Sequence, residues 1–286
     1  MIEIVEVGPR DGLQNEKAWV PTDAKVAFVN ALNKTGTRQI EVTAFVSPKW
    51  VPQLKDAREV LERIERSEGI EYSALVPNLR GFERAMECDV DKLALFTAAS
   101  ETFNSKNINT TIDGSFERMK RVCDAASESR KPVRGYISTA FHCPFEGAIQ
   151  PQLVTDIAIR LLDLGVHDVS IGDTIGKANV DEVKRLLDHL LKVVPTEKVA
   201  MHFHDTFGQA AENVVASWEM GVEIFDSCTG GIGGCPYAPG APGNVATATV
   251  VRALRQAGAD IPYDLDAVDS AHIEIRDYLG VTPVLQ

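Results

Sequence analysis

The sequence predicts an α/β fold, a (β/α)8 TIM barrel with an additional C-terminal helix. Short β-rich runs alternate regularly with longer amphipathic runs along the 286 residues. Each later strand candidate follows a helix candidate and a short turn such as KTGTRQ or LGVHD, which is the repeat of a parallel sheet. Eight strand candidates are present, the number that closes such a barrel. We therefore expect one domain over 1–286, with the barrel at about 1–258 and a helical extension at about 259–286.

The strand candidates are four to six residues long, and the helix candidates repeat apolar residues at intervals of three and four. The expected strands are 2–7, 39–43, 71–76, 92–96, 133–138, 168–171, 198–203 and 222–226. The expected helices around them are 22–34, 53–66, 114–127, 151–164, 180–193, 209–220 and 243–257, followed by the additional helix at 264–278.

An open, doubly wound sheet is the rival fold for this alternation of strands and helices. Such a sheet usually carries a glycine-rich phosphate loop after its first strand. Here the first strand is followed by GPRDGLQNEK instead. The one long Gly/Pro-rich stretch, GGIGGCPYAPGAPGN at 230–244, comes after the last strand. These observations favour the closed barrel.

The composition excludes several classes of partner. The formal charge of −12 argues against a nucleic-acid surface or a polybasic membrane patch, while a small anionic substrate needs only a few local cations. The apolar runs are too short to span a bilayer, and the opening MIEIVEV has no feature of a targeting segment. The five cysteines form an odd set without C-x-x-C, which favours free thiols in a reducing compartment. We expect a cytoplasmic protein.

Reactive side chains follow the carboxyl ends of the predicted strands, which is where TIM barrels place their active sites. They come from the first, second, third, sixth, seventh and eighth strands or from the segments that follow them. They are Arg10, Asp11, Glu41, Asn78, Asp173, His202, His204, Asp205, Cys235 and Asn244.

The two histidines of HFHDTFGQA are two residues apart on a strand, so both side chains point to the same side. Asp11 and Asn244 add oxygen atoms on the same rim, because strands seven, eight and one are neighbours in a closed barrel. Two imidazoles with oxygen ligands and no thiolate favour Mg²⁺, Mn²⁺ or a similar divalent ion with open water positions over a structural zinc site. A polar pair without any metal is the alternative.

Arg10, Glu41 and Asp173 each allow a functional and a structural interpretation. A guanidinium at the barrel mouth stabilises the charge of an enolate oxygen, whereas Arg10 could also form a plain surface ion pair with Asp11. Glu41 either orients Arg10 or faces outward. Asp173 is either a base or a support for the metal ligands, or else a turn former.

The cysteines divide in the same way. Cys235 lies in the long Gly/Pro-rich stretch, which suggests a lid that brings a proton donor to a carbanion. His142 and Cys143 in FHCPFEG follow strand five, where packing of the loop explains them as well as a functional role does. The other three cysteines are expected in the core or at helix contacts.

Several motifs run nearly from end to end of the sequence: VEVGPRDGLQNEK, FVSPKWVPQ, KNIN, RGYIS, CPFEG, GDTIG, HFHDTFGQA and GGIGGCPYAPGAPGN. Together they resemble the 3-hydroxy-3-methylglutaryl-CoA lyase family of the DRE-TIM metallolyase superfamily, which also contains isopropylmalate and homocitrate synthases. The resemblance implies a catalytic barrel that binds an acyl-CoA thioester. The implied reaction is a retro-Claisen cleavage that gives acetyl-CoA and acetoacetate.

The resemblance also implies roles for individual residues. Arg10 matches the arginine assigned to enolate stabilisation, Glu41 and Asp173 match functional carboxylates, and Cys235 matches the catalytic loop thiol. The initial base is Asp11, Asp173 or His202, and a homodimer is among the assemblies that the resemblance allows. The implied ligands of the divalent metal, Mg²⁺ or Mn²⁺, are Asp11, His202, His204 and Asn244, and the implied CoA contacts are Lys17 and Asn107.

Three positions depart from the family pattern and keep alternatives open. Ala248 stands where a glutamate is usual, Ala44 where many relatives have serine, and His142 where they tend to have glycine. The loss at 248 could weaken support of the Asn244 region, and the other two are expected near substrate contacts. A lyase for citramalyl-CoA or a longer 3-alkyl-3-hydroxyglutaryl-CoA is therefore the nearest rival. A condensing synthase would usually carry a further C-terminal domain, and a barrel that only binds a ligand is the non-enzymatic alternative.

Overall fold

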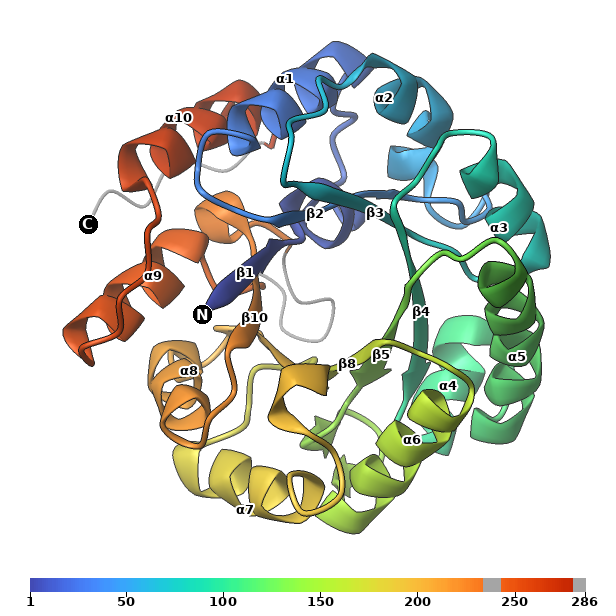
Figure 1. The fold of residues 1–286 in the computed structure, drawn as a ribbon, viewed down its shortest axis with the longest axis vertical. Coiled ribbons are helices and arrows are strands. Elements are labelled where there is room, and N and C mark those ends of the chain that lie inside the picture. Colours follow the sequence, from blue (N-terminus) through green and yellow to red (C-terminus); the bar gives the residue numbers. More distant parts are fainter. Residues whose placement is uncertain (234–242, 280–286) are drawn as a thin grey trace.

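A computed structural model describes residues 1–233 and 243–279 and contains a closed barrel of eight parallel strands (Figure 1). Around the barrel the strands follow the order β1-β10-β9-β8-β5-β4-β3-β2. Every strand of the barrel overlaps one of the eight predicted runs, so the predicted fold class is confirmed. The strands are β1 (Glu3–Glu6), β2 (Gln39–Ala44), β3 (Glu71–Leu75), β4 (Lys92–Ala98), β5 (Val133–Ser138), β8 (Asp168–Asp173), β9 (Val199–Phe203) and β10 (Ile224–Ser227).

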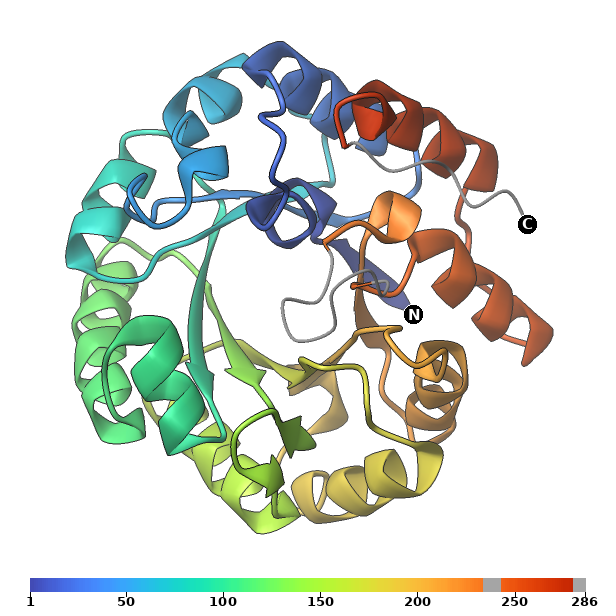
Figure 2. The ribbon, with the colours of Figure 1, turned by 180° about the vertical axis from the view of Figure 1, so that it is seen from behind.

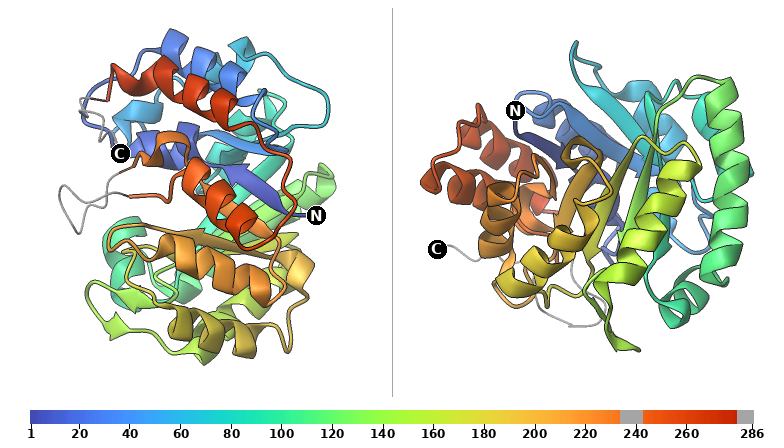
Figure 3. Two further views of the ribbon diagram at one scale, coloured as in Figure 1. Left: turned by 90° about the vertical axis from the view of Figure 1, so that its left-hand side faces the viewer. Right: turned by 60° about the horizontal axis from the view of Figure 1, so that its bottom comes forward.

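Helices surround the barrel on its outer side, as the views from both ends show (Figures 1 and 2). The last one packs against the first helix and confirms the expected additional C-terminal helix (Figure 3). None of the helices in the described part of the chain is long and apolar enough to cross a membrane. They are α1 (Thr22–Leu32), α2 (Ala57–Arg63), α3 (Leu79–Met86), α4 (Glu101–Ile108), α5 (Ile112–Glu128), α6 (Pro151–Asp163), α7 (Val180–Leu190), α8 (Ala210–Glu219), α9 (Thr247–Gln256) and α10 (Leu265–Arg276).

The structure differs from the predicted elements mainly at short segments. The expected helix at 53–66 is divided into a 3₁₀ turn (Pro52–Leu54) and α2. The expected helix at 243–257 begins later, because Asn244 and Ala246 form β-bridges with His204 and Cys228. The eight-residue helices α3 and α4 were not predicted; a side-chain cap begins each of them. A small hairpin, β6 (His142–Cys143) with β7 (Gly147–Ala148), was also not predicted.

The hydrophobic core lies mainly between the barrel and the surrounding helices and includes the fully buried Phe28, Leu93 and Phe225. The cysteines Cys88, Cys123 and Cys228 are buried and free, as expected for packing residues. Polar side chains of the strands are buried as well, and several of their charges are paired. Lys92 Nζ lies 2.8 Å from Asp168 Oδ1, for example. Such pairing stabilises the fold, because a single buried charge without a partner would be strongly destabilising.

Candidate metal centre

One end of the barrel brings Asp11, His202 and His204 together. His202 lies on β9 and His204 directly follows it, while Asp11 belongs to a π-helical turn, η1 (Gly8–Gly12), after β1. One potential ligand atom from each of the three residues lies within 4.8 Å of the other two. The ring centroids of the two histidines are 5.3 Å apart. The predicted convergence of the histidine pair with Asp11 is therefore present.

Asn244 completes this group from the segment before α9. Its Nδ2 donates to Asp11 Oδ2 at 3.0 Å and to the carbonyl oxygen of Ile232 at 3.2 Å. Asn244 Oδ1 and His204 Nδ1 are both buried without a hydrogen-bond partner among the described residues. A buried polar atom without a partner costs about 1–3 kcal/mol. Two imidazoles, a carboxylate and an amide oxygen are a donor set that fits a divalent cation.

The charge states of Asp11 and His204 also favour cation binding. Burial opposes the ionisation of Asp11, but Arg10 and the two histidines lower its pKa to about 2. Burial and the neighbouring His202 lower the pKa of His204 to about 4, so this ring is neutral at pH 7. Burial also disfavours charged His202, yet Asp226 and Asp11 raise the pKa of this ring. An ionised carboxylate and a neutral imidazole are the forms that bind metals.

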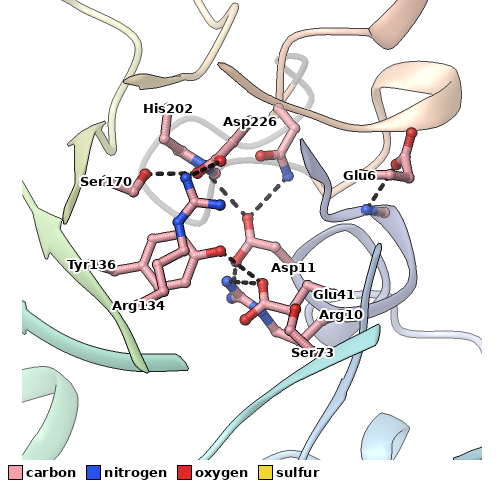
Figure 4. Close-up of polar contacts among 12 residues, drawn as sticks. Glu6, Arg10, Asp11, Glu41, Ser73, Arg134, Tyr136, Ser170, His202 and Asp226 are labelled. Carbon is pink, nitrogen blue, oxygen red and sulfur yellow. Dashed lines mark hydrogen bonds and ion pairs between the residues drawn. The ribbon is translucent and has the colours of Figure 1, made fainter. Parts of the chain in front are cut away.

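Arg10 lies beside this group between two carboxylates. Its Nε donates to Glu41 Oε2 at 2.7 Å, and its Nη1 forms an ion pair with Asp11. The guanidinium carbon is 5.2 Å from the centroid of the Tyr136 ring, whose hydroxyl donates to Glu41 Oε2 at 3.0 Å (Figure 4). Glu41 is fully buried, so the outward-facing interpretation is wrong and the predicted contact with Arg10 is present. This contact holds the guanidinium beside Asp11, His202, His204 and Asn244, which together form the candidate metal group.

A cavity of about 790 Å³ opens beside the four side chains Arg10, Asp11, His202 and His204. It continues past the carboxyl ends of β3 and β4 toward α4 and α5. Lys106 and Arg118 line it, together with apolar groups such as Phe96. A metal group with an adjacent arginine thus communicates with a cavity large enough for a small-molecule ligand.

The other predicted site residues are placed differently. Asn107 lines the cavity, whereas Lys17 is exposed and does not line it. Asp173 accepts hydrogen bonds from the backbone N–H groups of Lys177 and Ala178, and burial raises its pKa to about 6. It does not line the cavity either. Cys235 lies outside the described residues.

Two of the positions that depart from the family pattern, His142 and Ala44, are not among the residues that line the cavity. His142 Nε2 lies 2.9 Å from Glu182 Oε1 on α7. Ala44 is buried in a small cluster with Leu54 and Leu75. Leu75 of this cluster lines the cavity, so the expectation that the two positions lie near substrate contacts stays a prediction. Ala248 is partly buried on α9 against the main core.

Three residues around the metal group were missed at the level of sequence: Arg134, Tyr136 and Asp226. The alternation of RGYIS already places Arg134 and Tyr136 on one side of a strand, which was the available signal. Asp226 lies on β10, directly beside His202 on β9 in the strand register. These residues form the layer on which the metal group rests (Figure 4).

A glycine pair tests how tightly the metal group is held. Gly176 and Gly165 both have positive φ, +66° and +87°. A Cβ at Gly176 would lie 2.8 Å from the His204 carbonyl oxygen and from the Thr206 nitrogen, whereas a Cβ at Gly165 would meet no atom within 4 Å. We expect Gly165→Ala to cost about 1–2 kcal/mol from backbone strain alone. Gly176→Ala should cost about 1–3 kcal/mol more from the collision. Urea unfolding of both variants measures the difference, and equal losses would contradict the close contact.

Comparison with known proteins places the chain in a defined group. Residues 1–274 match the HMGL-like family. The "3-hydroxy-3-methylglutaryl-CoA lyase, cytoplasmic" of Rattus norvegicus is 46% identical over 270 residues, which cover 94% of this chain and 79% of that protein. The crystal structure of the HMG-CoA lyase from Brucella melitensis is 46% identical with a TM-score of 0.96, over 98% of this chain and 99% of the other. An HMG-CoA lyase from Acinetobacter baumannii was solved in complex with coenzyme A and 3-methylmalate. It is 39% identical, with a TM-score of 0.94, over 100% of this chain and 93% of the other.

Proposed function

The chain belongs to the HMGL-like family of metal-dependent lyases, and we propose that it cleaves 3-hydroxy-3-methylglutaryl-CoA to acetyl-CoA and acetoacetate. Relatives named for this activity share 46% of its residues over nearly the whole chain. The observation that carries the proposal is Arg10 beside Asp11, His202 and His204 at one cavity. We propose residues 1–286 as a single catalytic domain.

We propose Mg²⁺ or Mn²⁺ as the metal, held by Asp11, His202, His204 and Asn244. The unpartnered Asn244 Oδ1 and His204 Nδ1 support this ligand set within the described part of the chain. A divalent cation, when bound here, would polarise the substrate oxygens and lower the pKa of the substrate hydroxyl. Oxygen ligands and the absence of a thiolate from the four favour these ions over structural zinc.

The CoA moiety is proposed to extend along the cavity toward α4 and α5. Lys106, Asn107 and Arg118 line that part, and the two cations suit the phosphates of an acyl-CoA. The related enzyme from Acinetobacter baumannii was crystallised with coenzyme A, which supports an acyl-CoA ligand. Lys17 keeps its proposed CoA contact, although it is exposed and outside the cavity lining.

The proposed reaction breaks the bond between C2 and C3 of the acyl group. Removal of the C3 hydroxyl proton forms the ketone of acetoacetate, and the electrons of the broken bond pass to C2 as a thioester enolate. Arg10 stabilises the negative charge on the enolate oxygen, and Glu41 holds the guanidinium in place. A proton added to C2 then gives acetyl-CoA, so atoms and electrons balance without an oxidant.

The roles of Asp173 and Cys235, two predicted catalytic residues, rest on different evidence. Asp173 binds the backbone of its own loop and does not line the cavity, so we propose that it shapes this loop and is not the initial base. Cys235 remains the proposed source of the proton for C2, on the family resemblance alone. The cytoplasmic location and the homodimer likewise remain predictions.

A panel of acyl-CoA substrates tests the substrate assignment. We expect release of acetyl-CoA from 3-hydroxy-3-methylglutaryl-CoA in Mg²⁺ or Mn²⁺, and none after treatment with EDTA. The panel includes citramalyl-CoA and a longer 3-alkyl-3-hydroxyglutaryl-CoA, because these are the rival substrates. Turnover of a rival with none of 3-hydroxy-3-methylglutaryl-CoA would refute the substrate but keep the reaction class. Equal turnover with EDTA would refute the metal requirement.

A further inference from the structure

The ring of His202 has two nitrogen atoms in different surroundings. Its Nδ1 lies 3.2 Å from Asp226 Oδ2, and its Nε2 faces Asp11 Oδ2 at 3.9 Å. Only Nε2 therefore points toward the proposed metal. A ring nitrogen binds a metal only through a free lone pair, so the ring proton has to reside on the other nitrogen.

Asp226 is itself fixed from two other sides. Ser170 Oγ donates to the same Oδ2 at 2.6 Å, and Arg134 Nη2 lies 3.0 Å from Oδ1 (Figure 4). All three groups come from strands of the barrel, and the side chains of Asp226 and Arg134 are no more than 2% exposed. The carboxylate therefore cannot turn away from His202 without breaking a buried ion pair.

We infer that Asp226 is a positioning residue, which keeps the ring proton of His202 on Nδ1 and so presents the Nε2 lone pair to the metal. A carboxylate that accepts from the second nitrogen of a metal-bound histidine fixes the orientation of the ring and increases the basicity of the ligand. His204 differs, because its Nδ1 is buried without a partner in the part of the chain that the structure describes. The two histidines are thus held to unequal degrees. This inference rests on the proposed metal ligation by His202.

Asp226→Asn tests the inference, and Asp168→Asn is its matched control. An amide at 226 can donate to Nδ1 and transfer the ring proton to Nε2, so we expect about a 10- to 100-fold weaker Mn²⁺ affinity, measured by EPR titration. Asp168 is also buried and also forms an ion pair with Arg134, at 3.1 Å from Nε. Its other ion-pair partner in the described part of the chain is Lys92 and not His202. The control therefore shares the loss of a carboxylate beside Arg134, and we expect it to retain Mn²⁺ affinity within about threefold of wild type, well short of the loss expected on removing such a partner.

The wild-type protein provides a second readout that does not depend on the folding of a variant. Long-range ¹H–¹⁵N NMR correlations distinguish Nδ1-protonated from Nε2-protonated rings, and the chain has only six histidines. With Mg²⁺ bound, we expect the His202 proton on Nδ1, and in Asp226→Asn a shift of this proton toward Nε2. The His202 signal is assigned from its loss in His202→Gln.

The outcomes separate this inference from the proposed function. A wild-type protein that binds no Mn²⁺ would overturn the metal ligation on which the inference rests. Mn²⁺ binding by the wild type that Asp226→Asn retains in full would overturn the positioning role alone. A proton on Nε2 of His202 in the wild type, or an equal loss of affinity in Asp168→Asn, would also overturn it.

Discussion

His204→Ala is expected to lower kcat/KM for cleavage of 3-hydroxy-3-methylglutaryl-CoA by about 1,000-fold at saturating Mn²⁺ for the wild type. Loss of one of four ligands weakens cation binding, and a bound cation contributes several kcal/mol of transition-state stabilisation in such reactions. Each 1.36 kcal/mol corresponds to about a tenfold change in rate. The ring is buried beside His202 and Asp11, so water cannot simply replace its donor atom with equal geometry.

The measurement is the initial rate of acetyl-CoA release over a range of Mn²⁺ concentrations. His189→Ala is the matched control, because His189 lies exposed on α7 and its Nδ1 contacts only a carbonyl oxygen of the same helix among its recorded hydrogen bonds. We expect this control to retain wild-type rates. The rate of His204→Gln, which keeps a polar side chain of similar length, should lie between the rates of His204→Ala and His189→Ala. An unchanged Mn²⁺ dependence in His204→Ala would show that this histidine is not a ligand.

The fold could be predicted because its signals are local and repeated. Alternation within strands and the regular β/α order require no knowledge of long-range contacts. The short helices α3 and α4 were not predicted because eight residues carry little helical preference of their own. Packing against neighbours, α5 for both and β4 for α4, stabilises them. The start of α9 was displaced by the bridge between His204 and Asn244, which joins residues 40 apart, since 244 − 204 = 40.

Of the site, the candidate metal ligands could be predicted, but not all of the residues that support them. The same-side placement of His202 and His204 follows from strand geometry, and Asp11 follows from the closure of the barrel. The layer beneath them was only partly predictable. The alternation of RGYIS places Arg134 and Tyr136 on one side of a strand, but the contact of Asp226 with His202 depends on the register between β9 and β10. For Asp173 and His142, the choice between a loop role and a cavity role depends on the loops that follow β8 and β5. Sequence alone does not set the path of these loops.

Arg10→Lys is expected to lower kcat by about 100- to 1,000-fold and to leave Mn²⁺ affinity nearly unchanged. Lysine keeps the charge, but a single ammonium cannot reproduce the planar fork that spans Glu41 and Asp11. Removing one preorganised donor to a developing oxyanion typically costs this much in rate. The positive charge therefore stays near the site, but the donors are no longer oriented toward the enolate oxygen. This loss should affect kcat more than KM.

Arg58→Lys provides a matched control for this substitution. Arg58 also spans two carboxylates, Glu62 at 2.7 Å and Glu87 at 2.9 Å, but on the exposed surface of α2. Exposed ion pairs contribute little, so the control should keep wild-type kcat and stability within about 1 kcal/mol. If Arg10→Lys raised KM and left kcat unchanged, Arg10 would act on the bound thioester and the enolate equally, and its role would be substrate binding. If only Arg10→Lys loses kcat, the result would show that the guanidinium held by Glu41 stabilises the negative charge that develops when the carbon–carbon bond breaks.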